Sequence, residues 1–193
     1  MKKKRFSLRQ KYLECYKFFK EAKPYIWIAV GIFVFTAIIG FIFPIFFREK
    51  IIELITEMAR MFKGKSGIET VFMIFFNNIK ASFFSVILGV GFGIFSIIAG
   101  VVNGYILGFV SREVVNEQGF LVLWQLLPHG IFEIPAILMS IGIGLKLGSN
   151  LLSKDTKGNL KKDAKSALQF FCFVIFPLLF VAAIIEGLLI III

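Results

Sequence analysis

The chain has 193 residues, of which 58% are hydrophobic and only 18% are charged, and its formal net charge is +10 at pH 7. Its mean hydropathy of +0.87 is far above what a water-soluble core of this size needs. These values exclude an ordinary soluble domain and predict an all-α, polytopic transmembrane helical bundle. Because the basic residues concentrate at the ends of apolar runs, we expect a lipid bilayer as the partner and no nucleic acid.

Residues 1–23 carry nine Lys or Arg, and their apolar side chains recur at helical spacing. This pattern predicts a basic amphipathic segment on the cytoplasmic leaflet. The apolar run 25–47 is longer than a signal-peptide core and lacks a cleavage signal, so we expect it to be a first, uncleaved span. Residues 24–193 then form a single transmembrane domain.

Residues 49–62 alternate charged and apolar side chains with a period near 3.6, which predicts an interfacial helix outside the span. The following stretch, 68–110, is long enough for two crossings or for an interfacial helix and one tilted crossing. We place spans at 71–91 and 94–110 and leave the alternative open.

A polar loop is expected at 111–119, followed by the apolar run 120–148, which contains Pro128, Gly130 and Pro135. Proline removes a helical hydrogen bond, so we expect a broken or strongly kinked helix there. A lysine-rich linker, 149–166, leads to the last predicted span, 168–192.

Charge counting tests the number of crossings. With five spans, Lys and Arg total fourteen in segments 1–23 and 149–166 and six in segments 48–70 and 111–119. This asymmetry obeys the positive-inside rule with a cytoplasmic N-terminus in the cell membrane. A topology with three full crossings and a re-entrant hairpin at 120–148 obeys the positive-inside rule equally well.

Several polar residues interrupt the apolar runs, and we group them as a predicted intramembrane cluster: His129, Glu133, Glu186, Asn77, Asn78 and Asn103. Ionisable groups in lipid are costly and normally face a cavity or a partner. His129 and Glu133 are four residues apart and fit an ion-handling pair, a hydrogen-bonded pair, or two ligands of a metal site completed by Glu186. The metal interpretation matches no strong spacing rule, so no metal site is predicted.

Glycines four residues apart form flat helix faces, and the sequence contains three such series: Gly89 with Gly93; Gly100, Gly104 and Gly108; and Gly144 with Gly148. In lipid, such faces allow close backbone approach. They predict packing within the chain or a homodimer seam. No nucleophile and base set or cofactor fingerprint is present, so no enzyme activity and no cofactor are predicted.

The chain resembles the stage II sporulation protein M family over roughly residues 25–190. The resemblance rests on Phe76-Asn77-Asn78, the glycine-rich run from Asn103 to Gly108, the segment Leu127 to Ala136, the segment Gly144 to Gly148, and Glu186. The Pro-His-Gly and Glu-x-Pro-Ala pattern within the segment Leu127 to Ala136 is specific to the family.

The resemblance implies a multi-pass membrane scaffold that recruits membrane or envelope proteins for remodelling. The glycine faces add the expectation of a homo-oligomer, favoured as a dimer. The alternative is a small transporter or channel in which His129, Glu133 and Glu186 line a path, since broken helices with midplane carboxylates are a transporter device.

Overall fold

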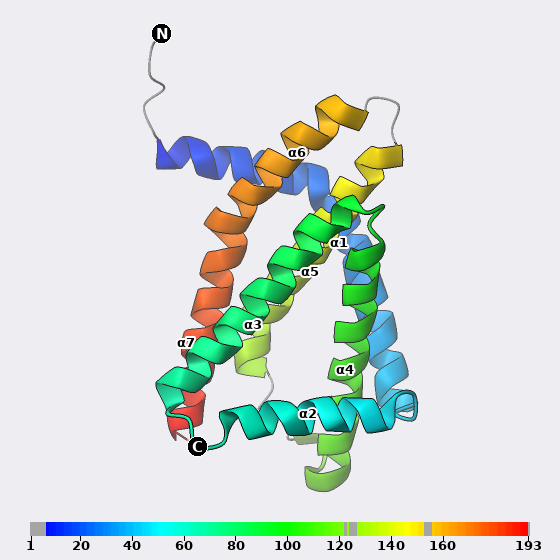
Figure 1. Ribbon diagram of the computed structural model, residues 1–193, viewed down its shortest axis with the longest axis vertical. Helices are drawn as coiled ribbons and strands as arrows, with labels where there is room; N and C mark the ends of the chain where they lie inside the picture. The colour runs from blue at the N-terminus through cyan, green and yellow to red at the C-terminus, as the bar shows by residue number, and fades with distance from the viewer. Residues whose placement is uncertain (1–6, 122, 124–126, 153–155, 193) are drawn as a thin grey trace.

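The computed structural model describes residues 7–121, 123, 127–152 and 156–192, which form helices and turns without a strand (Figure 1). Side chains are described for these residues except 58, 59, 62, 127–129, 152, 156–159 and 187–192. The α-helices are α1 Leu8–Ile42, α2 Arg48–Phe62, α3 Gly67–Ile87, α4 Ile94–Gln118, α5 Leu127–Ser149, α6 Thr156–Phe170 and α7 Phe176–Ile192. Two 3₁₀ turns, η1 Leu88–Val90 and η3 Asn150–Leu152, and a π-helical turn, η4 Phe171–Ile175, complete the described elements.

Five stretches are long and apolar enough to cross a membrane: Leu8–Ile42, Gly67–Val90, Ile94–Gln118, Gly130–Ser149 and Leu160–Glu186. The predicted polytopic all-α bundle is therefore confirmed, and the stretch 68–110 forms two long helices rather than one. Large apolar side chains such as Trp27, Phe35 and Phe84 are exposed on the outside of these helices. Lipid is the solvent that such faces require.

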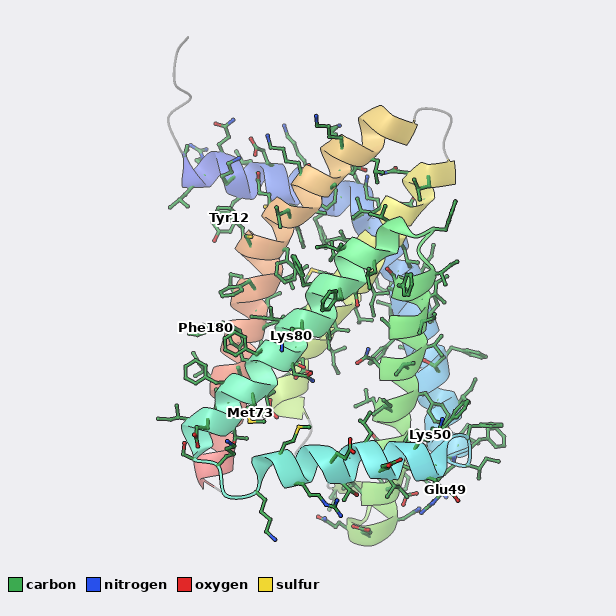
Figure 2. The ribbon with its side chains drawn as sticks, viewed as in Figure 1. Tyr12, Glu49, Lys50, Met73, Lys80 and Phe180 are labelled. Atoms are coloured by element: carbon green, nitrogen blue, oxygen red, sulfur yellow. The ribbon has the colours of Figure 1, made fainter. Side chains whose placement is uncertain are left out.

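Helix α1 joins two segments that differ in composition. Its first part runs across one end of the bundle, which we call the α6 end, and the rest descends along the bundle (Figure 1). Pro24 lies inside the helix, where it removes a hydrogen bond and favours a bend. Tyr12 on the first part packs edge-on against Phe173 of η4, with ring centroids 5.8 Å apart (Figure 2).

Helix α2 crosses the opposite end of the bundle, which we call the α2 end, at a steep angle to the spans (Figure 1). It begins at the turn after α1, where Glu49 and Lys50 lie (Figure 2), and it runs to the loop before α3. Ile52, Leu54 and Met61 are exposed on it. This position agrees with the interfacial helix that the periodicity predicts.

Helix α3 begins with a capping box, in which the Ser66 side chain accepts from the backbone N–H of Glu69 and the Glu69 carboxylate accepts from that of Ser66. The turn η1 and Gly93, whose φ is +74°, then reverse the chain into α4. Helix α4 continues to Gln118, so the polar loop expected at 111–119 is helical. The charged side chains there extend a span beyond its apolar part.

Helix α5 is the central helix, because it packs against α1, α3, α4 and α7 and buries Ile141, Ile143 and Leu147. The run 120–148 is not a single α-helix, since α5 begins at Leu127. Pro128 therefore lies in the first turn, where proline costs little because its missing N–H has no partner there. The helix continues through Gly130 and Pro135, so the predicted interruption does not lie within Leu127–Ser149.

The segment expected to be a lysine-rich linker is largely helical, since α6 covers Thr156–Phe170 and continues through η4 into α7. Its lysines, alanines and leucine are good helix formers. The widened π turn of η4 ends two residues before Pro177. A proline ring collides with the carbonyl four residues earlier, here Phe173, and the widened turn gives it room.

The glycine series Gly100, Gly104 and Gly108 lies in the contact between α4 and α1. A Cβ added at Gly104 would lie closer than 3.0 Å to the Phe33 carbonyl oxygen, and one at Gly108 closer than 3.0 Å to the Ala37 carbonyl oxygen. Gly40 of α1 meets the Tyr105 carbonyl in the same way. Backbone therefore packs on backbone along this seam.

The remaining glycine pairs join α5 to the turn between α3 and α4. A Cβ on Gly89 would lie closer than 3.0 Å to Gly144, and one on Gly148 closer than 3.0 Å to the backbone of Gly89 and Gly93. The buried Ser96 hydroxyl donates to the Ser85 carbonyl at 2.8 Å beside them. All seven predicted packing glycines thus lie in contacts within the chain.

Tyr105 of α4 ties together the segment between α1 and α2. Its hydroxyl lies 2.9 Å from the Phe43 carbonyl oxygen and 3.0 Å from that of Phe46. Arg48 adds a two-bond ion pair to Glu113, at 2.9 and 3.1 Å. Together these contacts hold the start of α2 against the end of α4.

Replacing Tyr105 by phenylalanine is expected to lower the free energy of unfolding by about 1 kcal/mol, because the two carbonyls lose a donor. Unfolding of the purified protein in detergent, followed by circular dichroism, measures this. Tyr12→Phe is the matched control, since the Tyr12 side chain is exposed on α1. Equal stability of the two variants would contradict a stabilising role for the Tyr105 hydrogen bonds.

Candidate functional site

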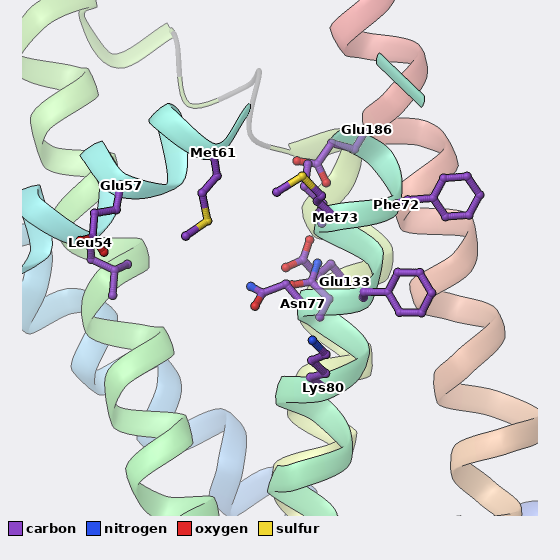
Figure 3. Close-up of a pocket in the computed structure, with 12 residues that line it drawn as sticks. Leu54, Glu57, Met61, Phe72, Met73, Asn77, Lys80, Glu133 and Glu186 are labelled. Atoms are coloured by element: carbon purple, nitrogen blue, oxygen red, sulfur yellow. The ribbon is translucent and has the colours of Figure 1, made fainter. Parts of the chain in front are cut away.

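A cavity of about 870 Å³ opens between α2 and α3 near the α2 end (Figure 3). Its polar lining consists of Glu57 from α2, Asn77, Asn78 and Lys80 from α3, Glu133 from α5 and Glu186 from α7. Four of these residues belong to the cluster predicted from the sequence. The fold therefore brings together polar groups from four helices at one site.

The remaining lining is apolar: Leu54, Met61, Phe72, Met73, Ile74 and Phe76. Leu54, Glu57 and Met61 recur at helical spacing on one face of α2, and Figure 3 shows them across the cavity from α3. On α3, Met73, Asn77 and Lys80 form a similar stripe. Two facing stripes, one on each helix, thus make the opposing walls.

Glu133 is the central polar group of the cavity. It is half-buried, and the Asn78 amide lies beside its carboxylate. The half-buried Glu186 carboxylate lies within electrostatic range of Glu133. Figure 3 shows Lys80 on the side of Glu133 and Asn77 that faces away from Glu186.

Among the described lining residues, carboxylates outnumber ammonium groups by three to one. Two of these carboxylates, Glu57 and Glu133, form no ion pair with a described residue, and neither does Lys80. Carboxylates without a countercharge in an apolar surrounding favour a cation or a hydrogen-bond donor. The site is therefore suited to a ligand that carries a positive group.

His129 and Asn103 are the other two members of the predicted cluster. His129 belongs to the first turn of α5, but its side chain lies outside the described part of the structure, so its pairing with Glu133 stays a prediction. Asn103 does not line the cavity, because its amide donates to the Ala99 carbonyl of its own helix at 2.8 Å.

Two polar residues of the cavity, Lys80 and Glu57, lie outside the predicted cluster, and no role was predicted for Glu57. It lies on the charged face of an amphipathic helix, and such a face is usually assigned to solvent. Only the placement of α2 across the bundle turns it toward the spans. No group of three or more His, Cys, Asp and Glu residues suited to a metal ion occurs within the described residues.

A second polar cluster lies at the α6 end, far along α5 from the cavity. The buried Lys146 ammonium pairs with the buried Asp163 carboxylate of α6, which also accepts a hydrogen bond of 3.1 Å from Asn150. Glu21 of α1 lies 3.6 Å from Lys146. Each buried charge has a countercharge, which indicates a structural tie rather than an open site.

Comparison with known proteins supplies relatives but no characterised activity. The chain is 34% identical over 99 residues to one uncharacterised protein of Methanocaldococcus jannaschii, covering 48% of this chain and 56% of that protein. It is 29% identical over 137 residues to another from the same organism, covering 68% of this chain and 60% of that protein. The chain thus spans less than two thirds of the length of these relatives.

No solved structure matches the chain. The family described as stage II sporulation protein M matches residues 24–189, which include α2, every cavity-lining residue and the glycine seams. Because the match covers most of the chain and includes the segments that carry the resemblance, the chain belongs to the stage II sporulation protein M family.

Proposed function

We propose that this multi-pass membrane protein is a small transporter whose substrate occupies the cavity between α2 and α3. The observation that carries the proposal is the convergence of Glu57, Glu133 and Glu186 on a space of about 870 Å³ between the amphipathic helix α2 and the apolar spans. Bundle proteins commonly place ligand sites between helices, and intramembrane carboxylates are costly unless they serve a ligand or an ion. The substrate therefore carries a positive group that the carboxylates accept.

The proposed orientation follows from charge. The first part of α1 and α6 lie at the same end of the bundle (Figure 1), and the segments 1–23 and 149–166 contain most of the Lys and Arg. By the positive-inside rule, the α6 end of the proposed transporter faces the cytoplasm. The membrane that it spans is then the cell membrane. The cavity then lies toward the outer face.

The test is flux in liposomes that contain the full chain. Radiolabelled choline and rubidium ions serve as soluble cations, and acyl-labelled fluorescent phospholipids serve as membrane substrates. We expect protein-dependent movement of at least one probe, reduced about tenfold or more in Glu133→Gln because a charged hydrogen-bonding partner is removed.

Glu53→Gln is the control, since Glu53 lies on the same helix as Glu57 but does not line the cavity. Flux that is equal in Glu133→Gln and the unmodified protein, or no flux of any probe, would contradict a transport role.

A membrane scaffold is the second candidate. Helix α2 favours it, because Ile52, Leu54 and Ile55 are exposed on a helix that crosses one end of the bundle. Such a helix offers a docking face for membrane or envelope proteins. The glycine seams lie inside the chain, so a homodimer, which stays a prediction, would use another surface. Partner capture that fails in Ile52→Glu but survives Glu133→Gln would favour this candidate.

A further inference from the structure

The lining of the cavity combines two chemically different parts. Glu133, Asn78 and Lys80 are polar, whereas Met61, Met73 and Phe76 are apolar. A small inorganic cation would leave the apolar part unused, and a purely apolar ligand would leave Glu57, Glu133 and Lys80 without an ion-pair partner among the described residues. The lining thus matches an amphipathic ligand.

The size of the cavity supports this choice. Its volume of about 870 Å³ lies near the top of the range of about 300–1,000 Å³ that is typical of sites for organic ligands. A bare metal ion with its ligands needs far less room. The volume accommodates a polar headgroup together with the first part of a hydrocarbon chain.

The charges specify the headgroup further. The carboxylates of Glu133 and Glu186 suit an ammonium group, and the Lys80 ammonium, on the side away from Glu186 (Figure 3), suits a phosphate. A ligand with a single charge would match only one of these. A zwitterion that carries a phosphate and an amine matches both.

The position of the cavity indicates how such a ligand arrives. Phe72 and Phe76 line it and are each 54% exposed on α3, one of the helices long and apolar enough to cross the membrane. In Figure 3 the ring of Phe72 points away from the polar groups of the cavity. A lipid can therefore reach the polar groups sideways from the bilayer with its chains against these rings.

We propose that the cavity binds the headgroup of a zwitterionic phospholipid that bears a primary amine. The ammonium group lies toward Glu133 and Glu186, and the phosphate lies toward Lys80. This inference rests on the proposed transport function, because it names the substrate class of the same site. The same phosphate and amine chemistry occurs in soluble phosphoethanolamine, which lacks the chains that the apolar lining accepts.

Native mass spectrometry of the full chain in detergent tests the proposal. The probes are phosphatidylethanolamine, phosphatidylcholine, which has no N–H donor, phosphatidylglycerol, which has no cation, and soluble phosphoethanolamine. We expect phosphatidylethanolamine to bind about tenfold more tightly than the other two lipids, the difference that a charge-assisted hydrogen bond supplies. Phosphoethanolamine should bind more weakly than the lipid.

Two variants and their controls locate the site. Glu133→Gln should remove the preference for phosphatidylethanolamine, and Lys80→Gln should weaken its binding about tenfold by removing the phosphate partner. Glu53→Gln and Lys63→Gln remove the same charges outside the cavity and should leave binding unchanged. Equal binding of the three lipids, or a preference that survives Glu133→Gln, would overturn the proposal.

The outcome is separable from that of the transport proposal. Movement of choline or rubidium that depends on Glu133, without selective phospholipid binding, would uphold a transporter and overturn the lipid assignment. Tighter binding of phosphoethanolamine than of the lipid would show a soluble source and would likewise overturn it.

Discussion

Replacing Lys146 by methionine is expected to lower the free energy of unfolding by about 3–5 kcal/mol, the cost of leaving a buried charge without its countercharge. Lys146 is 8% exposed and Asp163 is 5% exposed, so water cannot solvate the carboxylate that remains. Asn150 would supply it with a single hydrogen bond of 3.1 Å. Because the pair joins α5 to α6, the loss should separate these helices at the α6 end. Equilibrium unfolding in mixed detergent micelles measures the change.

The double variant Lys146→Met with Asp163→Leu distinguishes an unpaired charge from lost packing. Replacing both charges by apolar groups of similar size removes the desolvation penalty, so most of the stability should return. Lys162→Met, at an exposed neighbouring position, should change stability by less than about 0.5 kcal/mol. A double variant as unstable as Lys146→Met alone would show that the ion pair is not what holds α5 to α6.

The spans could be predicted from the sequence because lipid imposes a simple requirement. A helix must present about 20 apolar residues to cross the bilayer, and this requirement acts on composition rather than on tertiary contacts. The ends of the helices were less predictable. Residues 111–118 and 156–166 are polar enough to suggest a loop and a linker, but polar residues with good helix propensity extend a span beyond the lipid.

The proline segment shows a second limit of sequence reasoning. Pro128 favours a break wherever it lies inside a helix, but it has almost no effect in a first turn. In the described part of the structure α5 begins at Leu127, which places Pro128 in its first turn. Pro135 does lie inside α5, and the contacts of this central helix with its neighbours keep it helical.

The candidate site could be predicted in part. The sequence predicted that four polar residues lie together: Glu133, Glu186, Asn77 and Asn78. Placing a polar side chain in lipid is costly in free energy, so such side chains are expected to face one another or a shared cavity. The Asn103 amide does not face the cavity, because it donates a hydrogen bond to a carbonyl of its own helix. Glu57 was not predictable, because periodicity shows that a helix has a polar face but does not show what that face meets.

Replacing Gly108 by alanine is expected to lower the free energy of unfolding by about 3 kcal/mol, near the upper end of typical overpacking costs. The added Cβ would lie closer than 3.0 Å to the Ala37 carbonyl oxygen and the Phe41 backbone nitrogen. Backbone atoms cannot rotate away as a side chain can, so α1 and α4 must separate over the whole seam. Equilibrium unfolding in mixed detergent micelles measures this decrease in the free energy of unfolding.

Gly31→Ala is the matched control, because Gly31 lies on α1 with nothing within 4 Å of an added Cβ. Alanine is the better helix former by about 1 kcal/mol, so this variant should be as stable as the unmodified protein or slightly more stable. The opposite signs at Gly31 and Gly108 separate helix propensity from close packing. If Gly108→Ala were also neutral, the α1 to α4 seam could not be a contact of backbone on backbone, and the glycine series would be free for association between chains.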